Sequence, residues 1–335
     1  MPMLDIFSND AFSVTSLTDA INKMPYLPGQ VGQLGLFRES GVSTISIMIE
    51  EKEGSLELIP TSPRGAPATQ NKHNKRKARS LLATHLTLED TILADEVQGV
   101  REFGSETAVQ SVQTVVNDRL GEMAAKHDLT LENLRLGAIK GEVIDADGVS
   151  VLYNLFDEFN VVANSDVDFD LDNANPANGA IKKLCHQIKR TMENALGAVP
   201  YDHIHAFCSA SFFDALVTHE EVTAAYDRFQ EGIFLRRGQA RGQFDYAGIV
   251  FEEYHGGSGC SIEDGEVRLF PVGVQGLFRQ YNAPADFVET VNTIGLPRYA
   301  KQAVDMEFGR WVKLHTQANP LPICTRPKVL IKGVA

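Results

Sequence analysis

The sequence predicts an α+β fold in which long extended segments accompany a compact α/β unit. Three observations support this class. Apolar residues recur every three or four positions from Ser105 to His127, which is the period of an amphipathic helix. Residues 43–60 alternate apolar and polar side chains, as a half-buried strand does. Residues 180–290 then alternate helix-like and strand-like pieces. With 335 residues and 43% hydrophobic content, the chain can bury a core.

The first 40 residues predict an extended arm without a core of its own, because Gly and Pro interrupt isolated hydrophobic residues in YLPGQVGQLGLFRES. In the strand that follows, Ile45, Ile47 and Ile49 are expected to face one way. The chain is extended again after a loop punctuated by Pro and Gly. The simplest geometry is a long two-stranded excursion with Thr61–Arg79 at its tip.

The tip of this excursion is basic, although the chain is acidic. The formal net charge is −13, so the chain outside the tip sums to −13 − 6 = −19. Three interpretations are open: a nucleic-acid contact, a solvated loop without a partner, and an inter-subunit arm that lies on acidic surfaces of identical copies. The tip has no aromatic side chain for stacking on bases, and we favour the inter-subunit arm. The candidate contact residues are Arg64, Lys72, Lys75, Arg76, Lys77 and Arg79.

The central region predicts two helices and a hairpin. The first helix spans Ser105 to about His127. Thr130 opens a second, shorter helix, which Gly141 closes. Residues 141–161 then predict a strand, a turn and a strand, because Asp147-Gly148 is a strong signal for a type I′ hairpin turn.

Residues 164–179 predict a linker, since they have no periodic apolar face beyond Val167, Phe169 and Leu171. An EF-hand loop starting at Asp166 would need Gly at its sixth position and Glu at its twelfth, and the sequence has Leu171 and Ala177 there. We therefore expect a solvated acidic face, with metal binding as the weaker alternative. The aspartates of this segment are Asp166, Asp168, Asp170 and Asp172.

The downstream unit predicts helices and strands in alternation. Its expected elements are a helix over Ile181–Leu196 ended by Gly197, a strand over Tyr201–Phe207, a helix over Ser211–Phe229 and a strand over Tyr246–Tyr254. The tail from Glu307 to Val334 is strand-like, and breaks are expected at Pro320, Pro322 and Pro327.

No spacing of residues supports catalysis or a cofactor. His203 and His205 share one strand face with Cys208 just beyond, which leaves a Cys/His nucleophile pair and an ordinary half-buried strand as alternatives. No third orienting group is identifiable, and this favours the strand. The segment His219-Glu220-Glu221 lacks the second histidine of a zincin. We predict no catalytic, cofactor-binding or metal-binding residue.

The remaining composition indicates the compartment. Four cysteines separated by 23, 52 and 64 residues form no C-x-x-C pair and fit a reducing compartment. The N-terminus lacks the features of a secretory signal, and no apolar run approaches about 20 residues, so we expect no membrane span.

Several blocks of sequence follow one another in a characteristic order. They are FRES (37–40), HDLTLENLRLGAIKGEVIDADG (127–148), DYAGIVFEEYHG (245–256), FPVGVQGLFRQYNAPADFVETVN (270–292) and EFGRWVKLHTQANPLPICTRPKVLIK (307–332). In this order the sequence resembles, essentially from end to end, the major capsid protein E family of lambda-like tailed phages.

The resemblance implies the tailed-phage major capsid fold. The N-terminal arm would comprise residues 1–40 and the extended loop residues 41–90. The peripheral domain, 91–177, would contain a long spine helix over 105–128 and the hairpin over 141–161. The axial α/β domain would comprise residues 178–300, and the C-terminal strands, 301–335, would return to both domains.

The resemblance also implies a function. Copies of the chain would assemble in the host cytoplasm into hexamers and pentamers of an icosahedral head, part of the virion, that encloses double-stranded DNA. The implied partners are a scaffolding protein, a portal protein and a decoration protein, with weak unspecific contact to the packaged DNA and none to a membrane. The alternatives are an encapsulin-like compartment shell on the same fold and a soluble Cys/His hydrolase that uses Cys208.

Overall fold

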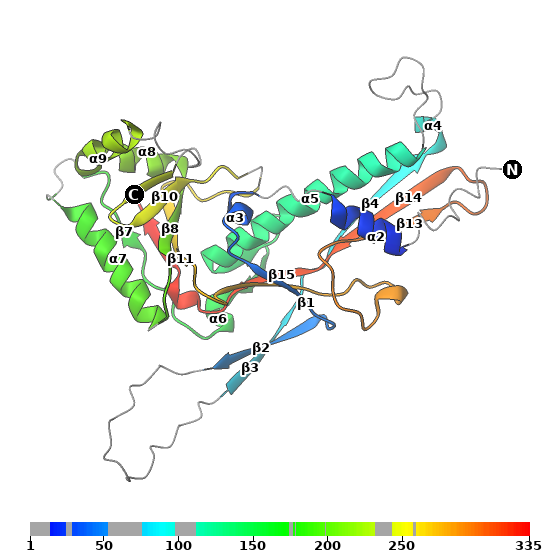
Figure 1. The fold of residues 1–335 in the computed structure, drawn as a ribbon, viewed down its shortest axis with the longest axis horizontal. Coiled ribbons are helices and arrows are strands. Elements are labelled where there is room, and N and C mark those ends of the chain that lie inside the picture. The colour runs from blue at the N-terminus through cyan, green and yellow to red at the C-terminus, as the bar shows by residue number, and fades with distance from the viewer. Residues whose placement is uncertain are drawn as a thin grey trace, which may run out of the picture.

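The molecule is elongated, with a sheet covered by helices at one end and a smaller sheet at the other (Figure 1). The computed structural model describes residues 14–24, 29–52, 76–97, 112–173, 177, 179–197, 199–231, 243–256 and 259–335. The long helix α5 connects the two ends, and the strands β2 and β3 project below it (Figure 1). Helices and sheets alternate without a regular βαβ repeat, and the predicted α+β class is confirmed.

Helix α5, Val112–Lys140, is continuous over 29 residues and about 44 Å long. The predicted division into two helices at Thr130 is wrong. Thr130 lies inside the helix, and its hydroxyl donates a hydrogen bond to the carbonyl of Lys126 at 2.9 Å. Neither Gly nor Pro occurs between the two predicted helices, so nothing there interrupts the backbone hydrogen bonds. Residues 105–111 of the predicted first helix lie outside the described residues.

The left body in Figure 1 contains a six-stranded sheet in the order β7-β16-β11-β8-β10-β9. Strand β8 lies parallel to β10 and antiparallel to β11. Helix α7, which matches the prediction, packs Ile181, Cys185 and Ile188 in the hydrophobic cluster of this body. The elements are β7 Val167–Asp168, α7 Ala180–Leu196, β8 His203–Cys208, α8 Ala210–Thr218, α9 Glu220–Glu231, β9 Gln243–Tyr246, β10 Ile249–Glu253, β11 Glu266–Val272 and β16 Ile331–Val334.

Two predicted elements of this body differ from the structure in their bounds. The single helix predicted from Ser211 is interrupted at His219, whose extended backbone separates α8 from α9 and whose Nδ1 accepts from the Glu221 amide at 3.2 Å. The strand predicted over Tyr246–Tyr254 is present as β10, Ile249–Glu253, and only its first residue, Tyr246, belongs to the preceding strand β9. Ala247 and Gly248 both have positive φ, as a type I′ turn requires, so the chain reverses there.

The segment predicted as a linker contributes a strand to the same sheet. Strand β7 pairs in parallel with β16, and Phe169 is buried with its ring centroid 5.2 Å from that of Phe212. Val167 and Leu171 pack partly buried against the same cluster. Val167, Phe169 and Leu171 therefore anchor the segment, and the aspartates that alternate with them are exposed.

The right-hand sheet in Figure 1 has the order β13-β14-β4. Helix α2 packs Leu17 and Ile21 in a cluster with Val116 and Leu120 from the first half of α5. Thr18 Oγ1 bonds both the amide and the carbonyl of Ala300, which fixes α2 against the edge of β13. The elements are α2 Val14–Lys23, β4 Leu86–Leu93, α4 Ala94–Val97, β13 Tyr299–Val304 and β14 Trp311–Ala318.

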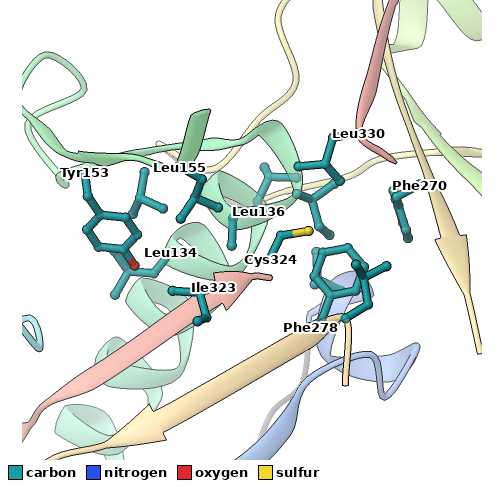
Figure 2. Close-up of a cluster of buried hydrophobic side chains, with 14 of the residues drawn as sticks. Leu134, Leu136, Tyr153, Leu155, Phe270, Phe278, Ile323, Cys324 and Leu330 are labelled. Carbon is teal, nitrogen blue, oxygen red and sulfur yellow. The ribbon is translucent and has the colours of Figure 1, made fainter. Parts of the chain in front are cut away.

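A third sheet, β1-β12-β15, crosses the middle of the molecule beside the largest hydrophobic cluster. Figure 2 shows Leu134 and Leu136 of α5 together with Tyr153, Phe278 and Ile323 in that cluster. The second half of α5 is thus anchored in a core separate from the one that holds its first half. The strands are β1 Arg38–Gly41, β12 Phe278–Asn282 and β15 Pro320–Cys324.

The predicted break at Pro320 is present, because β14 ends at Ala318 and β15 begins at Pro320, whereas the predicted break at Pro322 is wrong, because Pro322 lies inside β15. Strand β15 pairs with β12 on one side only, and the ladder bonds include the Ala283 amide to the Asn319 carbonyl and the Thr325 amide to the Leu277 carbonyl. The two prolines occupy the alternate positions, where an amide would point away from β12. The predicted break at Pro327 is present as a short 3₁₀ turn, η4 Pro327–Val329.

The hairpin predicted over 141–161 is shorter than expected. Strands β5, Glu142–Ile144, and β6, Val151–Asn154, pair antiparallel, and the helical turn α6, Leu155–Glu158, replaces the end of the second strand. The Asn154 side chain caps α6 by accepting from the amides of Phe156 and Asp157. Of the two turn residues, only Gly148 has positive φ, while Asp147 accepts from the Val149 and Ser150 amides in a longer loop.

Candidate assembly surfaces

Strands β2, Ser46–Lys52, and β3, Arg76–Leu82, form the predicted two-stranded excursion. One face of it is buried through Ile47, Ile49 and Leu81, and it joins the central core. Three large apolar side chains of the excursion are exposed, and we call them the hairpin face. They are Ile45 (60% exposed), Met48 (71%) and Leu82 (70%). The expectation that Ile45 shares the face of Ile47 and Ile49 is wrong, because Ile45 precedes the strand.

The six predicted contact residues are placed unequally. Arg64, Lys72 and Lys75 lie outside the described residues. Arg76 and Lys77 begin β3, where the register sets them opposite Lys52 and Glu51. The sixth residue, Arg79, is half-buried, and its guanidinium carbon lies 5.8 Å from the centroid of the Phe159 ring in its own chain. Arg79 therefore has an intrachain contact, and the inter-subunit role of the set stays a prediction.

A second exposed apolar surface lies on the loop between β12 and β13. Its members are Val288 (88% exposed), Val291 (63%), Ile294 (71%) and Leu296 (41%), which we call the aliphatic ridge. The loop contains the 3₁₀ turn η3, Val288–Thr290. Thr290 Oγ1 donates to the carbonyl of Ala285 at 2.7 Å, and the Gly295 amide donates to that of Val42 at 2.9 Å. These bonds hold the ridge in one conformation.

A third exposed apolar surface is the turn between β13 and β14. Met306 is 91% exposed and Phe308 is 71% exposed. The Asp305 carboxylate accepts from the amides of Glu307, Phe308 and Arg310, and these bonds lower its pKa. The turn is therefore rigid as well as apolar. Exposed hydrophobic side chains on ordered backbone are typical of surfaces that other protein covers.

The N-terminal segment 29–33 is held between α5 and the six-stranded sheet. In the short helix α3, Gln30–Gln33, the amides of Val31 and Gly32 donate to the Glu132 carboxylate of α5 at 2.7 and 3.1 Å. Burial raises the pKa of Glu132, although these two bonds lower it. A Cβ on Gly29 would overlap the Glu132 carboxyl group and would displace that side chain from the Val31 and Gly32 amides.

The other side of α3 bonds to strand β10. Gln30 Nε2 donates to Glu252 Oε1 at 2.7 Å and to the Glu253 carbonyl at 2.8 Å. Burial alone would raise the pKa of Glu252, but bonds from His205, Gln243 and Gln30 outweigh it and lower that pKa. One short segment of the arm thus connects the long helix with the sheet of the body.

The Cys/His alternative is not supported by the geometry. Strand residues alternate between faces, and Phe207 belongs to the central cluster while Cys208 belongs to the cluster under α7. His205 therefore lies on the face opposite to Cys208, with its Nε2 3.0 Å from Glu252 Oε2. Cys208 is fully buried, and burial raises the pKa of its thiol well above the ordinary value. The two side chains do not form a nucleophile–base pair.

Three of the aspartates of 164–179 have separate partners instead of a common one. Asp166 pairs with Lys332 at 3.2 Å, Asp168 accepts from the Asp170 amide, and Asp170 accepts from the Asn173 side chain. Within the described part of the chain, no three His, Cys, Asp or Glu side chains are grouped as metal ligands.

The fold is that of phage capsid proteins. The putative capsid protein of a prophage of E. coli CFT073 matches with a TM-score of 0.58 at 13% identity, over 96% of this chain and 99% of its own. The capsid of Ralstonia phage GP4 matches with a TM-score of 0.55 at 10% identity, over 89% of this chain and 87% of its own. At such low identity the likeness shows the fold alone.

Comparison of sequences identifies the family. The major capsid protein of Pseudomonas phage KPP10 is 26% identical over 345 residues, which cover 97% of each chain. The major capsid protein of Salmonella phage Felix O1 is 25% identical over 365 residues and 98% of each chain. A sequence model of the family described as Phage major capsid protein E matches residues 13–335. The chain therefore belongs to the phage major capsid protein E family, and the predicted resemblance is confirmed.

Proposed function

We propose that this chain is the major capsid protein of a phage, and that its copies join as hexamers and pentamers in an icosahedral head around double-stranded DNA. The family match over residues 13–335 carries this proposal. The three exposed apolar surfaces support it. The described residues of one chain leave them open to solvent, and contact with other copies would bury them.

The same proposal gives each segment of the chain a role in the shell. Residues 1–40 serve as an arm, 41–90 as an extended loop, 91–177 as a peripheral domain and 178–300 as an axial domain, while 301–335 return to both. The basic residues of 61–79 then contact acidic surfaces of neighbouring copies. The net charge of −13 supplies many such surfaces.

The remaining partners are also proposals. A scaffolding protein, a portal protein and a decoration protein act during assembly in the host cytoplasm, and the finished chain resides in the virion. An acidic inner surface leaves packaged DNA weakly held, so that it slides instead of sticking. A strongly positive potential on the inner wall of the particle would contradict this. No helix in the described ranges is long and apolar enough to cross a membrane.

The role is structural and not enzymatic. The separation of His205 from Cys208 across the sheet supports this statement. An encapsulin-like compartment would share the fold, but both sequence relatives are phage major capsid proteins, which favours the phage head. Terminase and portal genes beside the coding gene would agree with the phage head, whereas an adjacent cargo enzyme would favour the compartment.

Electron microscopy of the purified protein tests the proposal directly. We expect closed shells or hexameric rings in negative stain. A chain that stays monomeric at high concentration, alone and together with the other head proteins, would refute the assembly function.

Charge reversal tests the basic loop. We expect K72E/K75E/K77E to reduce particle yield while the far-UV circular dichroism of the unassembled chain stays unchanged. Arg79 is left intact because it contacts Phe159 in its own chain. The matched control is K182E/K183E/R190E, which makes the same charge change at exposed positions of α7. Equal yields from both triple variants would show that the loop makes no special charged contact.

A further inference from the structure

A layer of buried polar side chains separates the right-hand core from the central core. On α5, His127 and Asp128 lie between the residues that belong to one core and those that belong to the other. The chain from β14 to β15 repeats this order, because a polar stretch follows Leu314 of the right-hand core and precedes Leu321 of the central core. The buried polar residues of that stretch are Thr316, Gln317 and Asn319. Buried polar groups require hydrogen-bond partners, since burial removes them from water.

A cavity of about 320 Å³ lies in this layer, and we call it the polar cavity. Four of its lining side chains are polar and more than nine-tenths buried. They are His127, Asp128, Gln280 and Arg298. The apolar part of its wall includes Leu86, Leu131, Pro297, Ala318 and Pro320. The volume is at the lower end of the range of small-molecule sites, roughly 300–1,000 Å³, and a wall with both polar and apolar parts is typical of such sites.

Arg298 supplies the polar cavity with a hydrogen-bond donor. Its Nη2 lies 3.4 Å from Asp128 Oδ1, whereas its Nη1 has no acceptor among the described residues. A buried guanidinium N–H without an acceptor costs free energy, and a ligand oxygen that accepts from Nη1 would recover it.

Two other lining residues supply acceptors. The Asn22 Nδ2 donates to two backbone carbonyls, both at 2.8 Å, which fixes the amide, and its Oδ1 has no donor in the described part of the chain. The Thr316 hydroxyl donates to the Leu88 carbonyl at 3.4 Å, so it accepts from His127 Nε2 and leaves Nδ1 of the neutral ring as an acceptor. A matching ligand therefore has donors as well as an acceptor.

The charges around the polar cavity are already matched in pairs. Asp128 lies beside Arg298, and Glu39 accepts from Arg135 Nη2 at 2.6 Å. A charged ligand would leave one charge without a counterpart in a partly buried site, and this favours an uncharged ligand. A hydroxyl group both donates and accepts, and the carbon atoms that carry hydroxyl groups fit the apolar part of the wall.

We propose that the polar cavity binds a small uncharged polyol of the sugar-alcohol or monosaccharide class. One hydroxyl oxygen accepts from Arg298 Nη1, and other hydroxyls donate to Asn22 Oδ1 and His127 Nδ1. Such a ligand contacts α2, α5 and the segment before β13 together, so it holds the N-terminal helix α2 on the long helix. This role goes beyond the proposed shell function and does not depend on it.

Saturation-transfer NMR on the purified full-length chain tests the class of ligand. The probes are myo-inositol as the polyol, putrescine as the cation and succinate as the anion. We expect transfer to myo-inositol at millimolar concentration, and weaker transfer to the two charged compounds. Absence of transfer to myo-inositol, or stronger transfer to either charged compound, would overturn the proposal.

Two variants test whether the polyol binds in the polar cavity. Ala318→Leu enlarges a side chain of the wall and should abolish the transfer, whereas the control Ala303→Leu makes the same exchange at an exposed position of β13 and should retain it. Arg298→Lys keeps the positive charge beside Asp128 but lacks the Nη1 donor. We expect it to bind myo-inositol about tenfold more weakly than the wild type.

Far-UV circular dichroism shows whether each variant is folded, and Arg298→Lys alone decides if Ala318→Leu is not. Wild-type affinity in the folded variants would place the polyol elsewhere and overturn the polar cavity as its site. Particle formation does not enter this readout, so a failure of the shell function is distinguished from a failure of ligand binding.

Discussion

His127 links helix α5 to the right-hand sheet through a buried polar contact. Its Nε2 lies 3.0 Å from the Thr316 hydroxyl of β14, and only 6% of the residue is exposed. Burial, together with the positive charges of Arg298 and His315, lowers the pKa of His127 from 6.5 to about 4. The neutral imidazole is therefore the form that fits the fold.

This shift predicts acid sensitivity. Between pH 6.5 and about 4, the unfolded chain binds a proton at His127 that the folded chain does not, so stability falls as the pH falls through this window. The loss is on the order of 3 kcal/mol. We expect His127→Gln to have a shallower decrease in urea midpoint from pH 7 to pH 4.5 than the wild type. Parallel decreases in the two proteins would contradict this origin of the acid sensitivity.

Glu132 affects stability with the opposite pH dependence to His127. Its pKa is raised, so its contribution to stability is largest at low pH and decreases as the pH rises through the folded value. The Val31 and Gly32 amides bond different oxygens of Glu132, so in Glu132→Gln the NH2 group replaces the acceptor of one of them. We expect faster hydrogen exchange at one of these amides, measured by NMR or mass spectrometry. Glu122→Gln, at an exposed position of α5, is the control and should leave both amides protected.

At the scale of elements, α5 contains two glycines with different surroundings. A Cβ on Gly121 would meet nothing within 4 Å, whereas a Cβ on Gly137 would lie 2.9 Å from the Val143 Cα and 3.1 Å from the Glu142 carbonyl oxygen. Gly137 thus allows β5 to pack directly on the helix.

The two positions predict opposite effects of the same substitution. Gly121→Ala should stabilise the chain by about 0.5–1 kcal/mol through helix propensity. Gly137→Ala should destabilise it, because the backbone of β5 has to move away from the helix. Chemical denaturation of the two variants measures both signs. If both variants were stabilised, β5 would not be packed against Gly137 as described.

Sequence patterns predicted the helices and strands that depend on neighbouring residues. They failed where the structure of a segment depends on residues far away in the sequence. The spacing of apolar residues identified α7 and the β2–β3 excursion. Pro322 was taken as a break, because the sequence does not show that its position faces away from the partner strand β12. Phe169 was placed in a linker, because its burial depends on Phe212 more than forty residues later.

The candidate surfaces were predicted only in part. The run of basic residues predicts that the excursion is a contact between copies, but the pattern of residues does not show which apolar side chains stay exposed in the fold. The ridge was missed altogether. Its spacing of about three residues, V-x-x-V-x-x-I-x-L, is also that of a buried helical turn, and only the fold distinguishes the two.

At the scale of the whole molecule, α5 connects two hydrophobic cores, because each half of the helix packs in one of them. Val116, Leu120 and Met123 belong to the core at the right-hand end, and Leu134 and Ile139 belong to the central core. Leu129 lies between these groups and is 45% exposed, so it can be changed without opening either core.

A break in helix α5 at Leu129 should allow the two ends of the molecule to unfold independently. The single tryptophan of the chain, Trp311, lies in the right-hand sheet and reports on that end alone. We expect Leu129→Pro to separate the unfolding curve followed by tryptophan fluorescence from the curve followed by circular dichroism. In the control Leu129→Ala, the offset between the two curves should match that of the wild type. Coincident curves for the proline variant would mean that the ends are coupled by other contacts.

The two prolines of β15 affect how this strand could pair with other copies of the chain at high local concentration. A head brings many copies of one chain together at very high local concentration, where any open strand edge could recruit the wrong neighbour. The outer row of β15 presents no amide hydrogen at positions 320 and 322, and the carbonyls there are already engaged by Thr84 and Tyr153. Additional strands therefore find no donor at these positions, and all five residues of β15 are buried within the described chain, so this strand offers no open edge to a neighbouring copy.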